Sequence, residues 1–385
     1  MNAPIYLDYN ATTPVAPEVA QTIHACVMEV FGNPSSSHGR GQQAAELIQG
    51  ARQSVAQLIG AAAHEIVFTG CATEANNLAL LGVARALRTT RRHLVISAIE
   101  HPAVMEPALH LQREGWALTL VPVDSHGRVS PADVGAALRP DTALVSIMHA
   151  NNEIGTLQPI AEIAQLTRTR DIVLHTDAAQ TAGKLPVNVN DLGVDLLSLA
   201  GHKFYATKGV GALYVRAGTP VLNILFGASQ ERGMRPGTEN VPAIAGFGTA
   251  AMLARQRLPD ATMHLSRLRD ALYQHLQDAI PGLALNGHPV ERLPNTLHLS
   301  FPKVSGRELL KLVSPDVEAS VGSACHSERD VVSGVLAAMG LDAARAMGAV
   351  RLSTGWMTTM AEVERAADVL IAGWRRLSSS SVAAF

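Results

Sequence analysis

Cysteine is scarce in this sequence, and neither sign of charge is in excess. The three cysteines among 385 residues, Cys26, Cys71 and Cys325, lie far apart and are odd in number. This favours a reducing compartment over a disulfide framework. Lys and Arg number 31 against 33 Asp and Glu, a net charge of −2. Nothing electrostatic therefore favours nucleic acid or an anionic membrane as a direct partner.

Long apolar runs are lacking as well. No stretch reaches transmembrane length, and residues 1–8 contain neither the basic region nor the apolar core of a signal peptide. We therefore expect a cytoplasmic protein that binds no membrane and is not exported, and we assign no metal site.

What the sequence does contain is an alternation of short apolar runs and amphipathic segments, in a chain that is 47% hydrophobic. Continuous apolar strands separated by helices predict an α/β fold whose mainly parallel sheet is covered on both faces. Ligands bind such sheets at the carboxyl ends of the strands. Strands are expected at residues 66–69, 93–97, 118–123, 143–149, 172–175 and 195–199, an antiparallel partner at 211–216, and helices at 73–87, 102–114, 131–138 and 159–170.

The last third of the chain predicts a second domain. A long helical region at residues 242–280, interrupted near Leu258–Pro259, reads as the connector into it. A strand at 295–301 and helices at 306–312 and 360–377 follow, and the Ser/Ala-rich tail at 378–385 is expected to be frayed.

Asp177 follows the strand expected at residues 172–175, and Lys203 follows the strand at 195–199 and a turn of small residues. A lysine held in a partly dry pocket has a lowered pKa and becomes a nucleophile toward a carbonyl. A carboxylate is the partner that a pyridinium nitrogen needs. The pair suggests pyridoxal phosphate held as a Schiff base, although Asp and Lys are common at strand ends and the pattern by itself is weak.

Further polar residues follow the predicted strands, each with an ordinary alternative. The small residues of the turn at 70–74 can cradle a phosphate at a helix N-terminus, or Thr73 can simply cap that helix. His101 can stack on a planar ring and move protons, or be an ordinary loop histidine. Asn151 and Asn152 can bind a ligand oxygen, which Gln180 could also reach, or only shape a turn.

The second half of the chain adds three candidates. The polar turn at 235–240 can bind a phosphate or cap the next helix. Arg351 stands alone in an apolar strand, where an inward guanidinium would need an anion such as a carboxylate and an outward one would be a surface residue. Cys325, beside His326 among small polar residues, has the setting of a reactive thiolate. Cys26 is expected to be buried and inert.

Taken together, these segments resemble the NifS/IscS-type cysteine desulfurases, in the class V group of fold-type I pyridoxal phosphate enzymes. The resemblance covers nearly the whole chain. It implies a large domain at 16–255, with a mainly parallel seven-stranded sheet between helices, and a smaller α+β domain from 1–15 and 256–385. The ordered motifs that carry it are Tyr6–Pro14, Gly32–Ser36, Ala72–Glu74, Glu100–His101, Asn151–Gly155, Asp177–Gln180, Gly201–Lys203 and Ser323–Cys325.

The resemblance also implies a reaction and a set of roles. L-cysteine would be converted to L-alanine in a homodimer, with the sulfur passed through a persulfide to an acceptor or scaffold protein whose identity the sequence does not give. The implied roles are Lys203 for the Schiff base and proton transfer, Asp177 for the pyridinium nitrogen, Gln180 and Asn152 for the phenolic oxygen and substrate, His101 for ring stacking and proton transfer, Thr73, His202 and the Ala72 amide for the phosphate, Thr238 for contact across the dimer, Arg351 for the substrate carboxylate, and Cys325 for the persulfide.

Some residues depart from the family pattern. Ala200 stands where a serine usually contacts the phosphate, and Trp356 stands where an arginine is common, which would change the charge near the substrate mouth. His326 can lower the pKa of the neighbouring thiol or be an exposed spacer. A selenocysteine lyase and a non-catalytic sulfur-relay scaffold remain alternatives.

Overall fold

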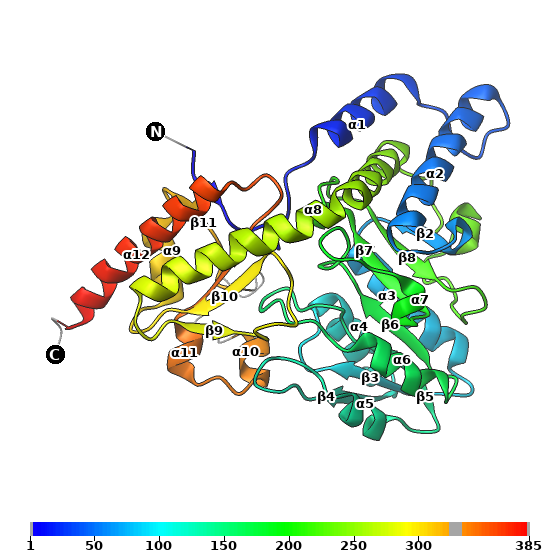
Figure 1. The fold of residues 1–385 in the computed structure, drawn as a ribbon. Coiled ribbons are helices and arrows are strands. Elements are labelled where there is room, and N and C mark those ends of the chain that lie inside the picture. The colour runs from blue at the N-terminus through cyan, green and yellow to red at the C-terminus, as the bar shows by residue number, and fades with distance from the viewer. Residues whose placement is uncertain (1–2, 323–332, 383–385) are drawn as a thin grey trace.

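A seven-stranded sheet forms the centre of the larger part of the molecule in the computed structural model, which describes residues 3–322 and 333–382 (Figure 1). Its strands run parallel except β8, which is antiparallel to both of its neighbours. The predicted mainly parallel sheet is therefore confirmed, including its antiparallel strand. In spatial order the strands are β2 (Ile66–Thr69), β8 (Gly211–Val215), β7 (Leu196–Ala200), β6 (Val173–Asp177), β5 (Thr142–Ser146), β3 (His93–Ser97) and β4 (Ala117–Val121).

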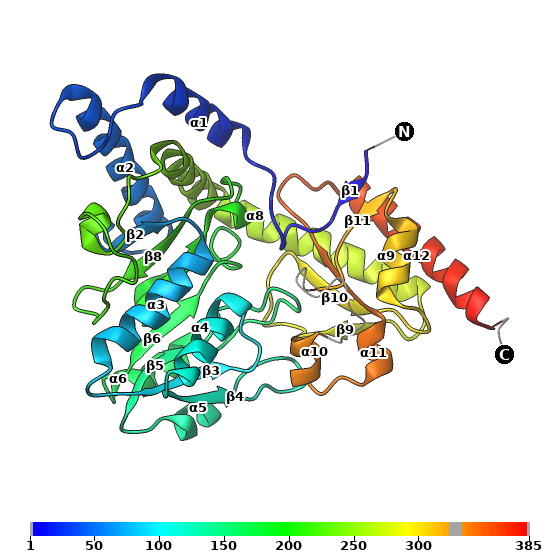
Figure 2. The same cartoon turned by 180° about the vertical axis from the view of Figure 1, so that it is seen from behind.

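Helices cover both faces of this sheet, which is why its inner strands are buried along their whole length. On one face α3 (Ala72–Leu87) and α4 (Pro102–Arg113) pack on alternate residues such as Leu94 and Leu144, and Figure 2 shows this side. The other face, with Val95 and Val145, packs on α2 (Gly39–Leu58), α6 (Ile160–Arg168) and the first part of α8 (Val241–Ala279).

A smaller hydrophobic core lies around an antiparallel sheet of strand order β12-β10-β9. The N-terminal residues Ile5 and Leu7 pack in this core with the second part of α8. Its elements are β1 (Ile5–Tyr6), β9 (Ala284–Asn286), β10 (Thr296–Ser300), α9 (Gly306–Val313), β11 (Val317–Glu318), β12 (Ala349–Ser353) and α12 (Met360–Val382). The short helices α10 (Gly334–Ala338) and α11 (Ala343–Met347) pack in a separate small cluster with Ile99, Met148 and Ile154. The remaining elements are α1 (Pro17–Glu29), α5 (Pro131–Ala137), α7 (Val189–Leu192) and the 3-10 turns Ala63–Glu65, Gly201–Lys203 and Gln230–Gly233.

Two expectations about helices are wrong. α8 continues for 39 residues with Pro259 inside it, so the interruption near Leu258–Pro259 does not occur. Proline removes one backbone hydrogen bond, but both parts of this helix are held by burial, one in each core (Figure 1). α12 extends to Val382, so residues 378–382 are helical rather than frayed, with Ser378 and Ser379 donating to the Arg375 carbonyl. Residues 383–385 lie outside the described residues.

No helix in the described part of the chain is both long and apolar enough to cross a membrane.

Candidate active site

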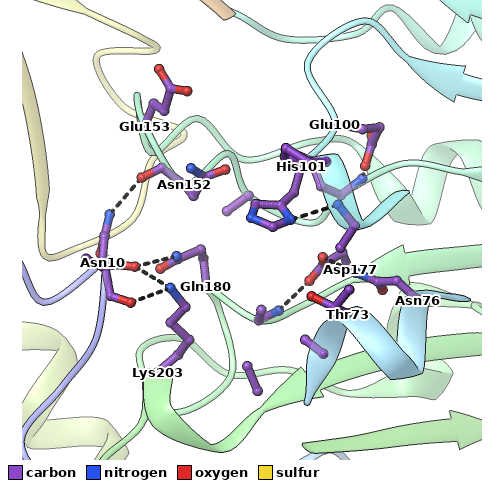
Figure 3. A pocket seen from close by; sticks show the side chains of 18 of the residues that line it. Asn10, Thr73, Asn76, Glu100, His101, Asn152, Glu153, Asp177, Gln180 and Lys203 are labelled. Carbon is purple, nitrogen blue, oxygen red and sulfur yellow. Dashed lines mark hydrogen bonds between the residues drawn. The ribbon is translucent and has the colours of Figure 1, made fainter. Parts of the chain in front are cut away.

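A pocket of about 270 Å³ lies at the carboxyl ends of the parallel strands, where the sheet meets the N-terminal segment and the smaller core. Figure 3 shows its polar side chains arranged around one space. The structure brings together here nearly all of the site residues predicted from the sequence, namely Ala72, Thr73, His101, Asn152, Asp177, Gln180, His202, Lys203 and Arg351.

Lys203 ends the tight turn that follows β7, and its amine is turned toward the N-terminal segment. Nζ donates to the carbonyl oxygens of Asn10 at 2.6 Å and Ala11 at 2.8 Å. Burial, and then the charge of Arg351, lower the pKa of Lys203 from 10.5 to about 8. An amine with this pKa is far more often neutral near pH 7 than an exposed lysine, as a nucleophile toward a carbonyl requires.

Asp177 is the last residue of β6, and its carboxylate is buried beside the pocket. It accepts hydrogen bonds from Asn76 Nδ2 at 2.7 Å and from the Ala179 amide at 2.9 Å (Figure 3). Asn76 was not predicted from the sequence. It is a fully buried amide on the apolar face of α3, between Ala75 and Ala79, and a polar residue on such a face was the available signal.

His101 caps the N-terminus of α4, so one nitrogen of its ring is already committed. Nδ1 accepts from the Ala103 amide at 3.1 Å. Because a backbone N–H can only donate, Nδ1 carries no proton and the neutral ring holds its proton on Nε2. Burial lowers the pKa of His101, which favours the neutral ring. The ring is therefore a neutral Nε2–H donor at the pocket (Figure 3).

One end of the pocket is suited to an anion. The N-terminus of α3 lies there, and the side chain of its N-cap residue, Cys71, does not cap it. His202, next to it, is kept neutral because burial lowers its pKa to about 4, and its Nδ1 pairs with Thr12 Oγ1 at 3.1 Å. A Cβ at Gly211 would lie only 2.7 Å from the Cys71 carbonyl carbon, so only glycine lets β8 pack against this turn. Ala200 lines the same pocket and offers no hydroxyl.

Two residues that sequence reasoning missed organise the middle of the site. The Asn10 carbonyl accepts from Gln180 Nε2 at 3.0 Å, and Asn10 Nδ2 donates to the Asn152 carbonyl at 3.2 Å (Figure 3). The buried Lys184 donates to Gln180 Oε1 at 2.8 Å and to Asn10 Oδ1 at 3.2 Å. Burial holds the pKa of Lys184 well below its usual value. A lone charged residue within 178–187, four residues after Gln180, was the available sequence signal.

Arg351 points inward from β12, so the surface-facing alternative is wrong. Its side chain is only 3% exposed, Nη1 donates to the Asn152 carbonyl at 3.1 Å, and Nη2 pairs with Asp8 Oδ1 at 2.6 Å. Nε has no hydrogen-bond partner within the described residues. A buried guanidinium with an unused N–H beside a pocket is suited to binding a carboxylate.

Other predicted residues lie elsewhere. Thr238 lines a separate cavity with Gly70 and Arg235. Cys325 and His326 fall outside the described residues. After that segment, Ser333 Oγ donates to Glu153 Oε2 at 2.6 Å, at the pocket wall.

Trp356 does not line the pocket, so the expected change of charge at the substrate mouth is not found there. Its ring stacks on Tyr205 with a centroid distance of 3.6 Å, and Arg257 lies over it at 4.2 Å. Cys26 is buried, as expected.

Comparison with known protein families identifies the class of this protein. The model of the aminotransferase class-V family matches residues 5–366. The chain belongs to this family, and its fold is that of the fold-type I pyridoxal phosphate enzymes.

Individual relatives narrow the comparison. The chain is 46% identical over 371 residues to cysteine desulfurase IscS of Dictyoglomus turgidum, covering 96% of this chain and 94% of that protein. It is 42% identical to cysteine desulfurase of Mus musculus, covering 98% of this chain and 83% of that protein. Among solved structures it is similar to a NifS-like protein, with a TM-score of 0.90 and 37% identity. The match covers 98% of this chain and 100% of that structure's chain. SspA in complex with cysteine matches with a TM-score of 0.82, 35% identity and coverage of 91% and 98%.

Proposed function

We propose that this protein is a pyridoxal phosphate-dependent cysteine desulfurase that removes sulfur from L-cysteine, releases L-alanine and passes the sulfur on from Cys325. The observation that carries the proposal is the arrangement of a lysine amine, a buried carboxylate and a buried guanidinium around one pocket. The names of the similar proteins point the same way.

The residues of the pocket fit the cofactor. Lys203 would bind it covalently, Asp177 would pair with its ring nitrogen, Gln180 would donate to its phenolic oxygen, His101 would stack on its ring, and the α3 N-terminus with Thr73 and His202 would hold its phosphate. The uncapped helix end supports the last assignment. When bound, the cofactor supplies an electron-withdrawing ring that loosens the bonds at Cα of an amino acid.

The chain's own groups then have distinct tasks. Arg351 and Asn152 would bind and orient the substrate carboxylate. Lys203, with a pKa of about 8, can take a proton from Cα and return it to the product near neutral pH. His101 would present its Nε2–H as a donor to the substrate.

Sulfur transfer requires a thiolate, which we assign to Cys325. The thiolate attacks the substrate sulfur, a sulfur–sulfur bond forms, and the carbon–sulfur bond breaks with its electron pair left on the carbon side. That carbon takes up a proton, so alanine and a Cys325 persulfide result. The terminal sulfur is then transferred to an acceptor protein for iron–sulfur cluster or thio-cofactor synthesis.

We further propose a cytoplasmic homodimer, with a large domain at 16–255 and a smaller one from 1–15 and 256–385. The two hydrophobic cores support the division. For the dimer, Thr238 lies away from the main pocket and lines a groove with Val27 and Phe31, whose side chains are exposed. The role of Thr238 across the dimer stays a prediction.

The test is product formation by the purified protein supplied with pyridoxal phosphate and L-cysteine. Wild type should release alanine and sulfide in equal amounts in the presence of a thiol, and Cys325 should gain the mass of one sulfur atom. Cys325→Ala should lose sulfide release, while Cys26→Ala, which removes a buried thiol elsewhere, should retain it. Sulfide release retained by Cys325→Ala would refute the persulfide step. Faster turnover of selenocysteine than cysteine would favour a selenocysteine lyase.

A further inference from the structure

The guanidinium assigned to the substrate carboxylate already has a carboxylate partner in the chain itself. Asp8 Oδ1 lies 2.6 Å from Arg351 Nη2. The two residues are 343 positions apart in the sequence, and nothing in the pattern around either of them predicts the pair.

Asp8 is placed by its backbone and not by the ion pair. It bridges to Ser353 in parallel register, and its carbonyl accepts from the amides of Ala11 and Thr12. Its side chain remains 21% exposed, so the carboxylate can turn toward solvent without unfolding its surroundings.

Arg351 is likewise held without Asp8. β12 pairs with β10 along its whole length, with Arg351 opposite His298. The Arg351 side chain is 97% enclosed and also donates to the Asn152 carbonyl. The contribution of Asp8 is therefore mainly charge: it neutralises a buried guanidinium that has no other ionic partner in the described part of the chain.

We propose that Asp8 is an internal competitor for the substrate carboxylate and determines how strongly the site selects carboxylate ligands. The proposal rests on the proposed function, in which Arg351 binds that carboxylate. A ligand carboxylate must either displace Asp8 or share the guanidinium with it at close range. In both cases part of the attraction of Arg351 is offset by a like charge, so affinity falls for a carboxylate ligand but not for a neutral one.

Asp8→Asn tests this because it keeps the size and the Oδ1 acceptor and removes only the charge. The probes are L-alanine and L-alaninamide, which share an amine and a side chain but differ in the carboxylate. Binding to the holoenzyme is followed by cofactor absorbance, without turnover. We expect the Kd of L-alanine to fall about three- to tenfold, the usual size of one partly screened charge interaction, and that of L-alaninamide to change less than about twofold.

The matched control is Glu318→Gln, which removes an exposed carboxylate on the neighbouring strand β11 and should alter neither Kd. With L-cysteine, Asp8→Asn should lower KM more than it changes kcat. Asp8→Ser, also neutral, should act in the same direction and replaces Asp8→Asn if that variant does not fold.

A weaker or unchanged affinity of Asp8→Asn for L-alanine would overturn the proposal. Asp8 would then hold the Arg351 side chain in position without competing with the ligand. Failure of the proposed function looks different. Wild type would then bind L-alanine no better than L-alaninamide, or would leave L-cysteine intact.

Discussion

The pH dependence of cofactor uptake provides a sharp test of the state of Lys203. With a pKa of about 8 in place of 10.5, roughly one amine in ten is neutral at pH 7, against about one in three thousand for an unperturbed lysine. The difference is roughly 300-fold in reactive amine. Uptake of pyridoxal phosphate by the cofactor-free protein should therefore rise with pH and reach half of its maximum near pH 8.

The measurement is the initial rate of absorbance change on adding pyridoxal phosphate to cofactor-free protein across a pH series. A small amine of known pKa, run in parallel, corrects for ionisation of the cofactor itself. Arg351→Gln removes a positive charge that lowers the pKa of Lys203, so its half-maximal pH should move upward. Arg267→Gln, on an exposed part of α8, should leave it in place. A wild-type half-maximum near pH 10, or a downward shift in Arg351→Gln, would refute the reasoning.

Two further variants test groups around the site. Burial raises the pKa of Glu100 to about 8, so the folded state binds more protons than the unfolded state between about pH 4.5 and 8, and stability must fall as pH rises through that window. The free energy of unfolding is measured at pH 5 and at pH 8 for wild type and for Glu100→Gln. The loss of stability between these two pH values should be smaller in Glu100→Gln by more than about 2 kcal/mol. An equal loss in both proteins would contradict the prediction. Trp356→Ala loses the stack on Tyr205 and the contact with Arg257 and should cost about 2–3 kcal/mol of stability. Its KM for L-cysteine should change less than about twofold, because Trp356 does not line the pocket, and a large rise in KM would show that it acts on the site.

The strands of the large sheet could be predicted from the sequence because their local and tertiary preferences agree. β3, β5 and β7 are buried on both faces, so apolar residues predominate in each strand and no alternation of apolar and polar residues competes. β6 is equally buried but carries His175, Thr176 and Asp177 after two apolar residues. Pro259 shows the opposite case. The local rule predicts a break, but burial of both parts of α8 in hydrophobic cores outweighs the loss of one hydrogen bond.

The contacts that complete the site could not be predicted, because each joins residues distant in the sequence. Asn10 donates to Thr296 across 286 positions, and Asn76 reaches Asp177 across 101. No periodicity or motif records such a pairing. In the sequence Lys184 is only a lone charged residue within 178–187, and its two amide acceptors are set by the fold.

The N-terminal segment at 8–11 links the lysine to the carboxylate site. Its carbonyls at Asn10 and Ala11 accept from Lys203, and its Asp8 carboxylate pairs with Arg351. Arg351 lowers the pKa of Lys203 and Asp8 raises it, so the lysine responds to the net charge at the guanidinium. When a substrate carboxylate shares the guanidinium with Asp8 it adds one negative charge there, whereas a carboxylate that displaces Asp8 leaves the net charge nearly unchanged. In the shared arrangement the proton affinity of Lys203 must rise as substrate binds, which makes the amine a stronger base when a proton has to leave Cα.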